Sequence, residues 1–405
     1  MALTQRQLFL QHIAQTSDAP LMLEICRAEG IYLYSPSGKQ YADLIAGISV
    51  SNLGHCHPEV VAAVQLQAAT YMHLMVYGEY ITAPQTELAS LLTKHLPSEL
   101  GSVYFVNSGA EATEGALKLA KRYTGRTGLV AFKNSYHGST HGALSIIGSE
   151  YFKQNYRPLL PDVCHLDYNN FEQLAQINHH TACVVAEPVQ AEAGVIVPKT
   201  GFLKALRDRC SQVGALLVFD EIQTGYGRTG TLFAFEQSEV VPDILLLAKG
   251  MGGGMPLGAF IASHNIMSVL TNNPVLGHIT TFGGHPVSCA ASLATLRVLL
   301  RENYIQEVKQ KEQLFRQQLI HPAIKSVRSA GLLIAVEFVD FSFTKQVIDR
   351  CIQKGVITDW FLFADNCLRI APPLTITPQQ IADACRIICE CAEEVGNNGV
   401  PFAGK

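Results

Sequence analysis

Short apolar runs alternate with helical patterns through the middle of the chain, and this alternation limits the possible folds more than any other feature. The predicted strands are Val103–Val106, Leu129–Phe132, Cys183–Glu187, Leu216–Asp220, Ile244–Ala248 and Ala259–Ala262. The predicted helices among and after them are Ala110–Tyr123, Phe202–Val213 and Cys289–Arg301. Strands that alternate with helices are typical of α/β domains with a mostly parallel sheet. We therefore expect an α/β fold of this kind.

The C-terminal part of the chain has a different pattern. Gly331–Phe338 and Leu368–Ile370 are predicted strands, and Thr344–Lys354 is a predicted helix. Thr377 directly precedes Pro378, a pairing that predicts the start of another helix at the proline. Strands and helices in this order indicate a smaller α+β lobe.

The length of the chain leaves room for more than one domain. At about 150 residues per domain, 405 residues correspond to two or three units. We expect a large domain over residues 50–300 and a small one over 301–405. The N-terminal arm, residues 1–49, is expected to join the small lobe.

Charge and composition exclude several classes of protein. The chain has 30 Lys+Arg against 34 Asp+Glu, so it offers no cationic surplus to nucleic acid or anionic lipid. No charged residue of these four types occurs from Gly250 to Leu296, and Gly, Pro, Asn and His interrupt this stretch, which predicts burial in the protein or at a subunit interface. The 11 cysteines are scattered among apolar positions, and the N-terminus lacks a signal-peptide pattern. We expect a cytoplasmic protein without a metal site.

Lys249 stands between an apolar strand and the charge-free stretch. A lysine in such a place is expected to be poorly solvated, which lowers the pKa of the amine and makes it a nucleophile toward carbonyls. A strand-end lysine whose ammonium reaches solvent explains the local pattern equally well.

Two further patterns are compatible with a site around this lysine. Asp220 ends a predicted strand, where α/β sheets place their ligands, although capping of the next turn explains Asp220 better on local grounds. Ser108 and Gly109 lead into a helix whose first amides could bind phosphate, although an ordinary helix cap is the simpler local explanation. Together, the amine, the carboxylate and the anion site match the needs of pyridoxal 5'-phosphate (PLP). The predicted cofactor is therefore PLP.

These residues lie in motifs that resemble those of the class III aminotransferases, the ornithine, acetylornithine and 4-aminobutyrate group of fold type I PLP enzymes. The resemblance runs over nearly the whole chain. Its motifs include Gly54-His55-Cys56-His57-Pro58, Asp220–Gly225, Gly227–Gly230 and Arg369–Pro373. The resemblance implies a fold type I transferase and a ping-pong transamination between an ω-amino donor and a 2-oxo acid.

The resemblance also implies roles for single residues. Lys249 resembles the Schiff-base lysine that also moves a proton between donor carbon and cofactor, and Asp220 resembles the acid that keeps the pyridine nitrogen protonated. Gln223 matches a partner of the phenolic oxygen, and Tyr136 matches the aromatic that stacks on the ring, although alone it would indicate a core aromatic. The phosphate would be held by Ser108, Gly109, Ala110 and, from a second subunit, Thr281. This implies a homodimer with shared active sites.

Glu192 and Arg369 match a pair of substrate-binding residues in the family. By resemblance, the acid masks the arginine while an ω-amino donor is bound. The acid then swings away, and the arginine binds the α-carboxylate of glutamate or 2-oxoglutarate. Taken alone, Glu192 would indicate a solvated loop acid and Arg369 a surface charge at a strand end.

Two departures from the family pattern concern the substrate. Ser139 stands where many members have an arginine that binds a second carboxylate, and a hydrogen bond to a charged group contributes about 1.5–3 kcal/mol. Ile48 stands where the ornithine enzymes have a tyrosine, which favours the acetylornithine and 4-aminobutyrate branches. We expect an acetylornithine-like donor and 2-oxoglutarate. The alternatives are a pyruvate-linked ω-aminotransferase, favoured by Ser139, a PLP aminomutase, and a non-catalytic protein of this fold.

Overall fold

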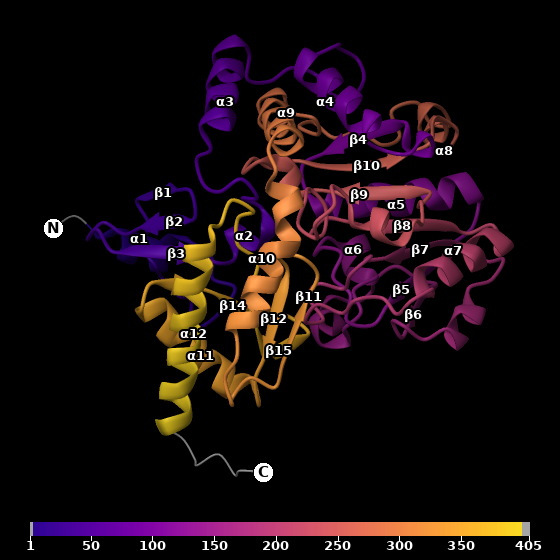
Figure 1. Cartoon of the computed structure of the whole chain (residues 1–405). Helices are drawn as coiled ribbons and strands as arrows, with labels where there is room; N and C mark the ends of the chain where they lie inside the picture. The colour runs from indigo at the N-terminus through magenta and orange to yellow at the C-terminus, as the bar shows by residue number, and fades with distance from the viewer. Residues whose placement is uncertain (1–2, 399–405) are drawn as a thin grey trace.

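The computed structural model describes residues 3–398, and a sheet of seven strands forms its largest layer (Figure 1). The strand order is β4-β10-β9-β8-β7-β5-β6. Only β10 runs antiparallel to its neighbours in this sheet. The strands are Ser102–Val106 (β4), Gly128–Phe132 (β5), Val163–Leu166 (β6), Thr181–Ala186 (β7), Leu216–Asp220 (β8), Ile244–Leu247 (β9) and Gly258–Ala262 (β10). The predicted α/β fold with a mostly parallel sheet is confirmed.

Six of these seven strands agree with the sequence prediction to within two residues at each end. The prediction missed β6, which lies at one edge of the sheet. Its sequence is only four residues long and contains His165, so it lacks the continuous apolar run that marks the buried strands.

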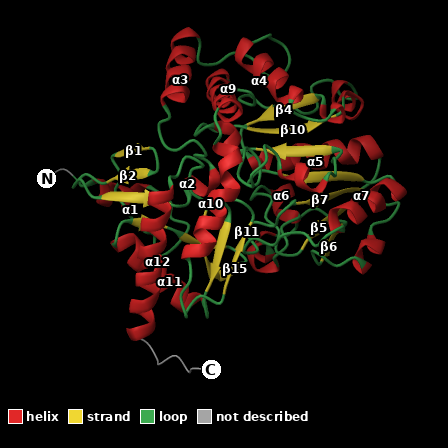
Figure 2. Ribbon diagram, viewed as in Figure 1, coloured by secondary structure: helices red, strands yellow, loops and turns green. Residues whose placement is uncertain are grey.

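Helices lie on both faces of the large sheet (Figure 2). Along β8, Leu217 and Phe219 belong to one apolar cluster with residues of α7 (Phe202–Val213), whereas Val218 belongs to another with residues of α5 (Gly109–Thr124). Burial on both faces explains why these strands are apolar throughout rather than alternating. Further helices of this part of the chain are α3 (Pro58–Thr70), α4 (Ala83–Lys94), α6 (His141–Ser145), α8 (His264–Met267) and α9 (Pro286–Arg301). Of these, α3 and α4 pack against α9, and α6 and α8 pack against α5.

Two smaller sheets involve the ends of the described chain. One has the order β1-β2-β3-β13, in which C-terminal β13 pairs in parallel with N-terminal β3. The other has the order β11-β12-β15-β14. Their strands are Arg27–Glu29 (β1), Tyr32–Tyr34 (β2), Gln40–Asp43 (β3), Ser326–Ser329 (β11), Ile334–Glu337 (β12), Val356–Ile357 (β13), Asp359–Phe361 (β14) and Ala364–Ile370 (β15). The N-terminal and C-terminal segments thus share one sheet, as expected if the N-terminal arm joins the small lobe. The division at residues 49/50 and 300/301 stays a prediction.

The remaining helices are α1 (Gln5–His12), α2 (Ala46–Ser49), α10 (Tyr304–Gln318), α11 (Phe341–Gln353) and α12 (Pro378–Asn398). The predicted cap of α12 is present, since Thr377 Oγ1 accepts a hydrogen bond from the Gln380 amide at 3.3 Å. Within residues 3–398, no helix combines the length and apolarity needed to span a bilayer.

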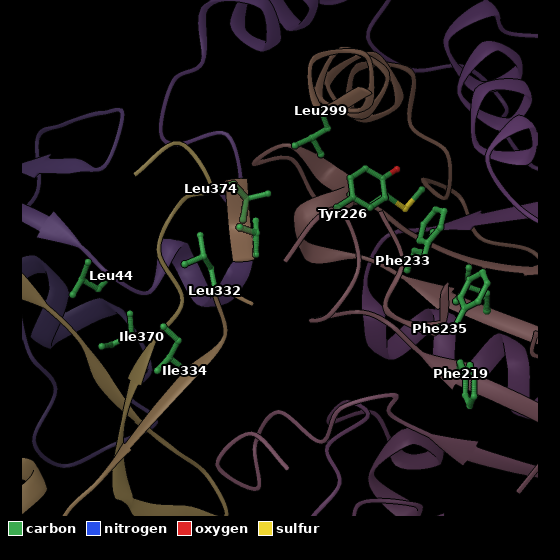
Figure 3. Close-up of a cluster of buried hydrophobic side chains, with 14 of the residues drawn as sticks. Leu44, Phe219, Tyr226, Phe233, Phe235, Leu299, Leu332, Ile334, Ile370 and Leu374 are labelled. Carbon is green, nitrogen blue, oxygen red and sulfur yellow. The ribbon is translucent and has the colours of Figure 1, made fainter. Parts of the chain in front are cut away.

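One apolar cluster connects the large sheet with the C-terminal part of the molecule. Figure 3 shows its side chains, which extend from Phe219 through Tyr226 to Leu332 and Ile370. Because this core is continuous, the strand ends of the large sheet and of the C-terminal sheet are held against each other. The candidate site lies at this junction.

Candidate active site

A cavity of about 620 Å³ lies at the carboxyl ends of β8 and β9 and at the start of α5. It is lined by seven of the ten residues predicted for the site: Ser108, Gly109, Ala110, Tyr136, Asp220, Gln223 and Lys249. Glu192, Arg369 and Thr281 are not among the lining residues. The carboxyl ends of parallel strands are where α/β sheets bind ligands, so the topology explains why these distant residues meet.

Lys249 follows β9 by two residues and has a φ of +48°, an unusual conformation for a residue with a side chain. Desolvation in the cavity lowers the pKa of its amine to about 8, and the charge of Glu192 opposes part of this shift. Within residues 3–398 the amine has no hydrogen-bond or ion-pair partner. A lysine of this kind has a substantial neutral fraction near pH 8 and can attack a carbonyl.

Asp220 is the last residue of β8 and is buried. Its Oδ2 atom lies 2.6 Å from Nδ1 of His137, and its Oδ1 accepts a hydrogen bond from the Ile222 amide at 3.0 Å. Burial alone would lower the pKa of His137, but the hydrogen bond and the charge of Asp220 raise it overall. The sequence prediction missed His137, whose only sequence signal was its place beside Tyr136.

Two other buried acids lie close to Asp220 in sequence or in space. Glu187 lines the cavity and accepts hydrogen bonds from the amides of Ala191 and Tyr136, at 2.9 and 3.3 Å. Burial raises the pKa of Glu187 to about 8, so its carboxyl group is largely protonated at neutral pH. Glu221 instead points away from the cavity and accepts from the amides that begin the next helical turn, at 2.6 and 2.7 Å. Of the Asp220-Glu221 pair, only Asp220 therefore serves the cavity.

Ser108 is the N-cap of α5, and its Oγ accepts a hydrogen bond from the Glu111 amide at 3.2 Å. The amides of Gly109 and Ala110 have no acceptor within residues 3–398 and lie at the positive end of a 16-residue helix. A Cβ atom at Gly109 would lie 2.8 Å from the Ile222 side chain, so a larger residue there would displace Ile222. This end of the cavity can bind an anion such as phosphate.

Glu192 and Arg369 form a buried pair beside the cavity, which we call the gate pair. The two Nη atoms of Arg369 donate to the two carboxylate oxygens of Glu192, at 2.8 and 2.9 Å. Burial opposes ionisation of Glu192, but Arg369 lowers its pKa overall. Gln223 Nε2 also donates to Glu192, at 2.9 Å, and so connects the cavity lining with the gate pair.

Arg369 has further partners on β14. Its Nη2 donates to the Trp360 carbonyl at 3.0 Å, and its Nε lies 3.0 Å from Oδ1 of Asp359. Burial raises the pKa of Asp359 to about 6, although Arg369 acts in the opposite direction. In this structure both Nη atoms of the guanidinium are engaged by protein groups, and a ligand carboxylate would have to replace Glu192.

Thr281 lies apart from these residues. Its side chain is exposed, in the segment that precedes α9, and it does not reach the cavity of its own chain. The neighbouring Thr280 does have an internal partner, since its Oγ1 accepts a hydrogen bond from Asn107 Nδ2 at 3.0 Å.

The residues of the cavity fit PLP. Two buried polar atoms, Gln223 Oε1 and His137 Nε2, lack a hydrogen-bond partner within the described part of the chain. They accompany an unpartnered amine, a carboxylate beside a histidine, and free amides at a helix start. PLP has an aldehyde, a ring nitrogen and a phosphate that match an amine, an acid and an anion site.

Comparisons with known proteins agree with this chemistry. Residues 13–392 match the family described as aminotransferase class-III. An acetylornithine aminotransferase of Methanosarcina acetivorans is 40% identical over 384 residues, which is 92% of each chain. One of Streptomyces coelicolor is 41% identical over 359 residues, which is 87% of each chain.

Solved structures show the same relationship. The ornithine aminotransferase of Toxoplasma gondii, described with PLP at its active site, is 30% identical and has a TM-score of 0.89 over 96% of this chain and 93% of that one. A transaminase of the marine bacterium Virgibacillus has a TM-score of 0.90 at 27% identity over 97% and 99% of the two chains. The predictions of a fold type I transferase and of PLP as cofactor are thereby confirmed, and this chain belongs to the class III aminotransferase family.

Proposed function

We propose that this enzyme transfers the terminal amino group of an acetylornithine-like ω-amino acid to 2-oxoglutarate in two half-reactions. The observation that carries the proposal is the gate pair beside the cavity of Lys249, because it provides an arginine that one carboxylate already occupies and another can take over. The relatives that are named acetylornithine aminotransferases, at 40 and 41% identity, support this choice of donor.

At the cofactor end, we assign each lining residue a role. Bound PLP supplies an aldehyde that takes up amino groups and a ring that withdraws electrons. Lys249 would hold the cofactor through its aldehyde and would carry a proton to and from the donor carbon, a task suited to an amine with a lowered pKa. Asp220, held by His137, keeps the ring nitrogen protonated. Gln223 binds the phenolic oxygen, and Tyr136 stacks on the ring.

The phosphate site extends beyond one chain in this proposal. Ser108, Gly109 and Ala110 bind the phosphate at the start of α5, and Thr281 binds it from a second subunit. Thr281 is exposed and cannot reach its own cavity, which supports a role in a neighbouring copy. The proposed assembly is a homodimer with shared sites. A cytoplasmic location also stays a prediction.

The gate pair selects between the two substrates. With Glu192 on Arg369, the pocket presents no free guanidinium, and an ω-amino group can approach Lys249. When glutamate or 2-oxoglutarate binds, its α-carboxylate replaces Glu192 on the guanidinium fork, so the number of charged hydrogen bonds is conserved. Gln223 lines the cavity and donates a hydrogen bond to Glu192, so this bond must break when Glu192 moves away.

Pyruvate is the second candidate acceptor, and one observation favours it. Ser139 lines the cavity and its Oγ lies 3.0 Å from the Tyr136 hydroxyl, so it is already paired with a neutral group. Lys249 is the one Lys or Arg among the described lining residues, and a second substrate carboxylate finds no cation there. Pyruvate has only one carboxylate, so it needs no second cation in the cavity.

A donor screen tests the proposal. The purified enzyme with PLP is mixed with acetylornithine, ornithine or 4-aminobutyrate, and loss of the cofactor's absorbance is followed. Either 2-oxoglutarate or pyruvate is then added, and its return is measured. The proposal requires loss with acetylornithine and return with 2-oxoglutarate. Return of the absorbance with pyruvate alone would favour the second candidate. Continued turnover of the donor without any added 2-oxo acid would favour an aminomutase.

A further inference from the structure

Arg228 is fully buried, yet it forms no ion pair with another residue in the range 3–398. Its Nη1 donates to the carbonyls of Leu332, at 3.0 Å, and Pro372, and its Nη2 donates to Oδ1 of Asn52 at 2.6 Å. Burial lowers its pKa to about 9, so the group is still cationic at neutral pH. A buried cation without a counter-ion is costly, which indicates that its three contacts serve a purpose beyond packing.

The two carbonyl acceptors lie at the same end of the strand pair that carries Arg369, beside the start of β12 and the end of β15. Leu332 precedes β12 by two residues, and Pro372 follows β15 by two residues. β12 and β15 pair antiparallel, with Ala335 opposite Arg369. One nitrogen of Arg228 therefore holds both strands where they enter and leave the region of Arg369.

The other side of Arg228 leads to the lysine. Asn52 accepts from Arg228 and donates through Nδ2 to the Tyr226 carbonyl at 2.8 Å. A Cβ atom added to Gly250 would lie 2.6 Å from this Nδ2, so Asn52 fills the space beside the residue that follows Lys249. The chain of contacts thus runs from the strands of Arg369 through Arg228 and Asn52 to the loop of the lysine.

The backbones of the Arg228 and Leu332 segments are also in direct contact. The Leu332 amide donates to the Arg228 carbonyl at 2.9 Å. Gly331 has a φ of +63°, and a Cβ atom there would lie 2.5 Å from that carbonyl oxygen. Figure 3 shows Tyr226, Leu332 and Leu374 from three separate segments around this place. Little space remains for the strands to shift once Arg228 is in position.

We propose that Arg228 is a positioning residue that sets the placement of Arg369 relative to Lys249, and thereby aligns a substrate's carboxylate with its reacting carbon. This inference rests on the role proposed above for Arg369. Lysine cannot replace Arg228, because a single ammonium lacks the planar fork that reaches acceptors in two directions. A misplacement of about 1 Å can slow a reaction by up to about 100-fold.

The test compares the two half-reactions in Arg228→Lys. By the proposal, kcat/KM for glutamate falls by about tenfold or more, while that for the ω-amino donor changes by less than about threefold, since only glutamate uses Arg369. A readout without turnover is the Kd of glutarate, an unreactive dicarboxylate, which should rise by a similar factor. The absorbance of bound PLP should not change. Equal losses in both half-reactions, or no loss, would overturn the proposal.

Lys311→Met is the matched control. Lys311 is buried and its Nζ donates to the Leu374 carbonyl at 2.6 Å, in the segment just after Pro372. It lies on α10, and within residues 3–398 its Nζ is hydrogen-bonded to neither Asn52 nor Arg228. The control should lower Tm without changing the ratio of the two half-reactions. A shift of that ratio in Lys311→Met would mean that general loosening explains the result, and would overturn the inference.

Two further variants separate the possible failures. Arg369→Ala must itself lose glutamate selectively, and if it does not, the proposed role of Arg369 is wrong independently of Arg228. If Arg228→Lys does not fold, Asn52→Ala removes one acceptor of the same guanidinium and should show a smaller loss of the same selectivity. Should neither variant fold, or should Asn52→Ala lack the selectivity, Arg228 is a structural residue only.

Discussion

The two ends of the active site are built in different ways. At the cofactor end, Asp220 ends one strand of the large sheet, and Lys249 and Ser108 follow two others, so their relative positions are given by the strand spacing. At the gate end, Glu192 follows β7 of the large sheet, whereas Arg369 lies on β15 of another sheet and 177 residues away. The cofactor end is therefore set by one rigid element, and the gate end by how two elements dock.

The two ends also differ in how burial affects the charges of their side chains. At the cofactor end, burial changes which groups are charged, since it lowers the pKa of Lys249 to about 8 and raises that of Glu187 to about 8. At the gate end, both partners remain charged and neutralise each other. A buried pair of this kind contributes little net stability. A ligand carboxylate that replaces Glu192 keeps the guanidinium paired. In the proposed function, the chemistry is therefore assigned to the first end and substrate selection to the second.

The largest expected effect comes from Lys249→Ala. The variant loses both the group that binds the aldehyde and the proton carrier, and general acid–base catalysis alone contributes about 10²–10⁴-fold. We expect turnover to become undetectable with every donor, while PLP still binds noncovalently. Borohydride treatment followed by peptide mapping should find no label on the variant, and label on position 249 of the native enzyme. Near-normal turnover would show that the cofactor end is assigned wrongly.

Asp220→Asn should follow in size. The amide cannot hold a proton on the ring nitrogen, and it also loses the charge that raises the pKa of His137. We expect kcat to fall by about 100-fold or more for both half-reactions, as for loss of a major electrostatic group. Stopped-flow absorbance measures the two rates. A loss confined to one substrate would contradict the assignment of Asp220 to the cofactor end, which both half-reactions use.

Arg369→Ala should affect mainly one half-reaction. Hydrogen bonds to a charged group contribute about 1.5–3 kcal/mol each, which corresponds to a loss of about tenfold or more in kcat/KM for glutamate. The ω-amino donor should be affected far less, because Arg369 is masked when it reacts. Arg369→Lys provides a control that keeps the charge without the fork. If all substrates lose equally, the gate pair is structural.

The smallest effect concerns stability and pH. The pKa of Glu187 is raised from 4.5 to about 8 in the folded protein, so the unfolded chain binds fewer protons between these values. The contribution of Glu187 to stability is therefore present below about pH 4.5 and is lost as pH rises toward 8. We expect the Tm of the native apoenzyme to fall relative to Glu187→Gln from pH 5 to pH 8. A constant difference in Tm over this range would contradict the shift.

Much of the cofactor end could be predicted from sequence because its determinants are local. A strand that ends at Asp220, a strand followed by Lys249, and a strand that turns at Ser108 into a helix each occupy a few consecutive residues. Strands in one parallel sheet end at the same edge, so three local patterns are sufficient to place three residues together. The resemblance to the family then added Tyr136, Gln223 and Thr281, whose local patterns alone would not distinguish them.

Other parts of the site have no local signature. The hydrogen bond between His137 and Asp220 joins residues 83 positions apart, and nothing near either residue indicates it. Arg228 lies in a glycine-rich turn motif, where an exposed cation would be the ordinary expectation, yet it is fully buried. Burial of a charge depends on what packs over it, and here the covering segments come from residues 52, 332 and 372.

The sequence by itself determined six of the seven strands of the large sheet, the edge at which its ligand binds, and the family to which the chain belongs, because apolar periodicity and short motifs act over neighbouring residues. Only the tertiary structure decided that Glu192 occupies Arg369, that His137 holds Asp220, and that Arg228 is buried where the sheets meet. These contacts join residues from about 80 to 180 positions apart, and their energies depend on desolvation by the packed core, which no local pattern encodes.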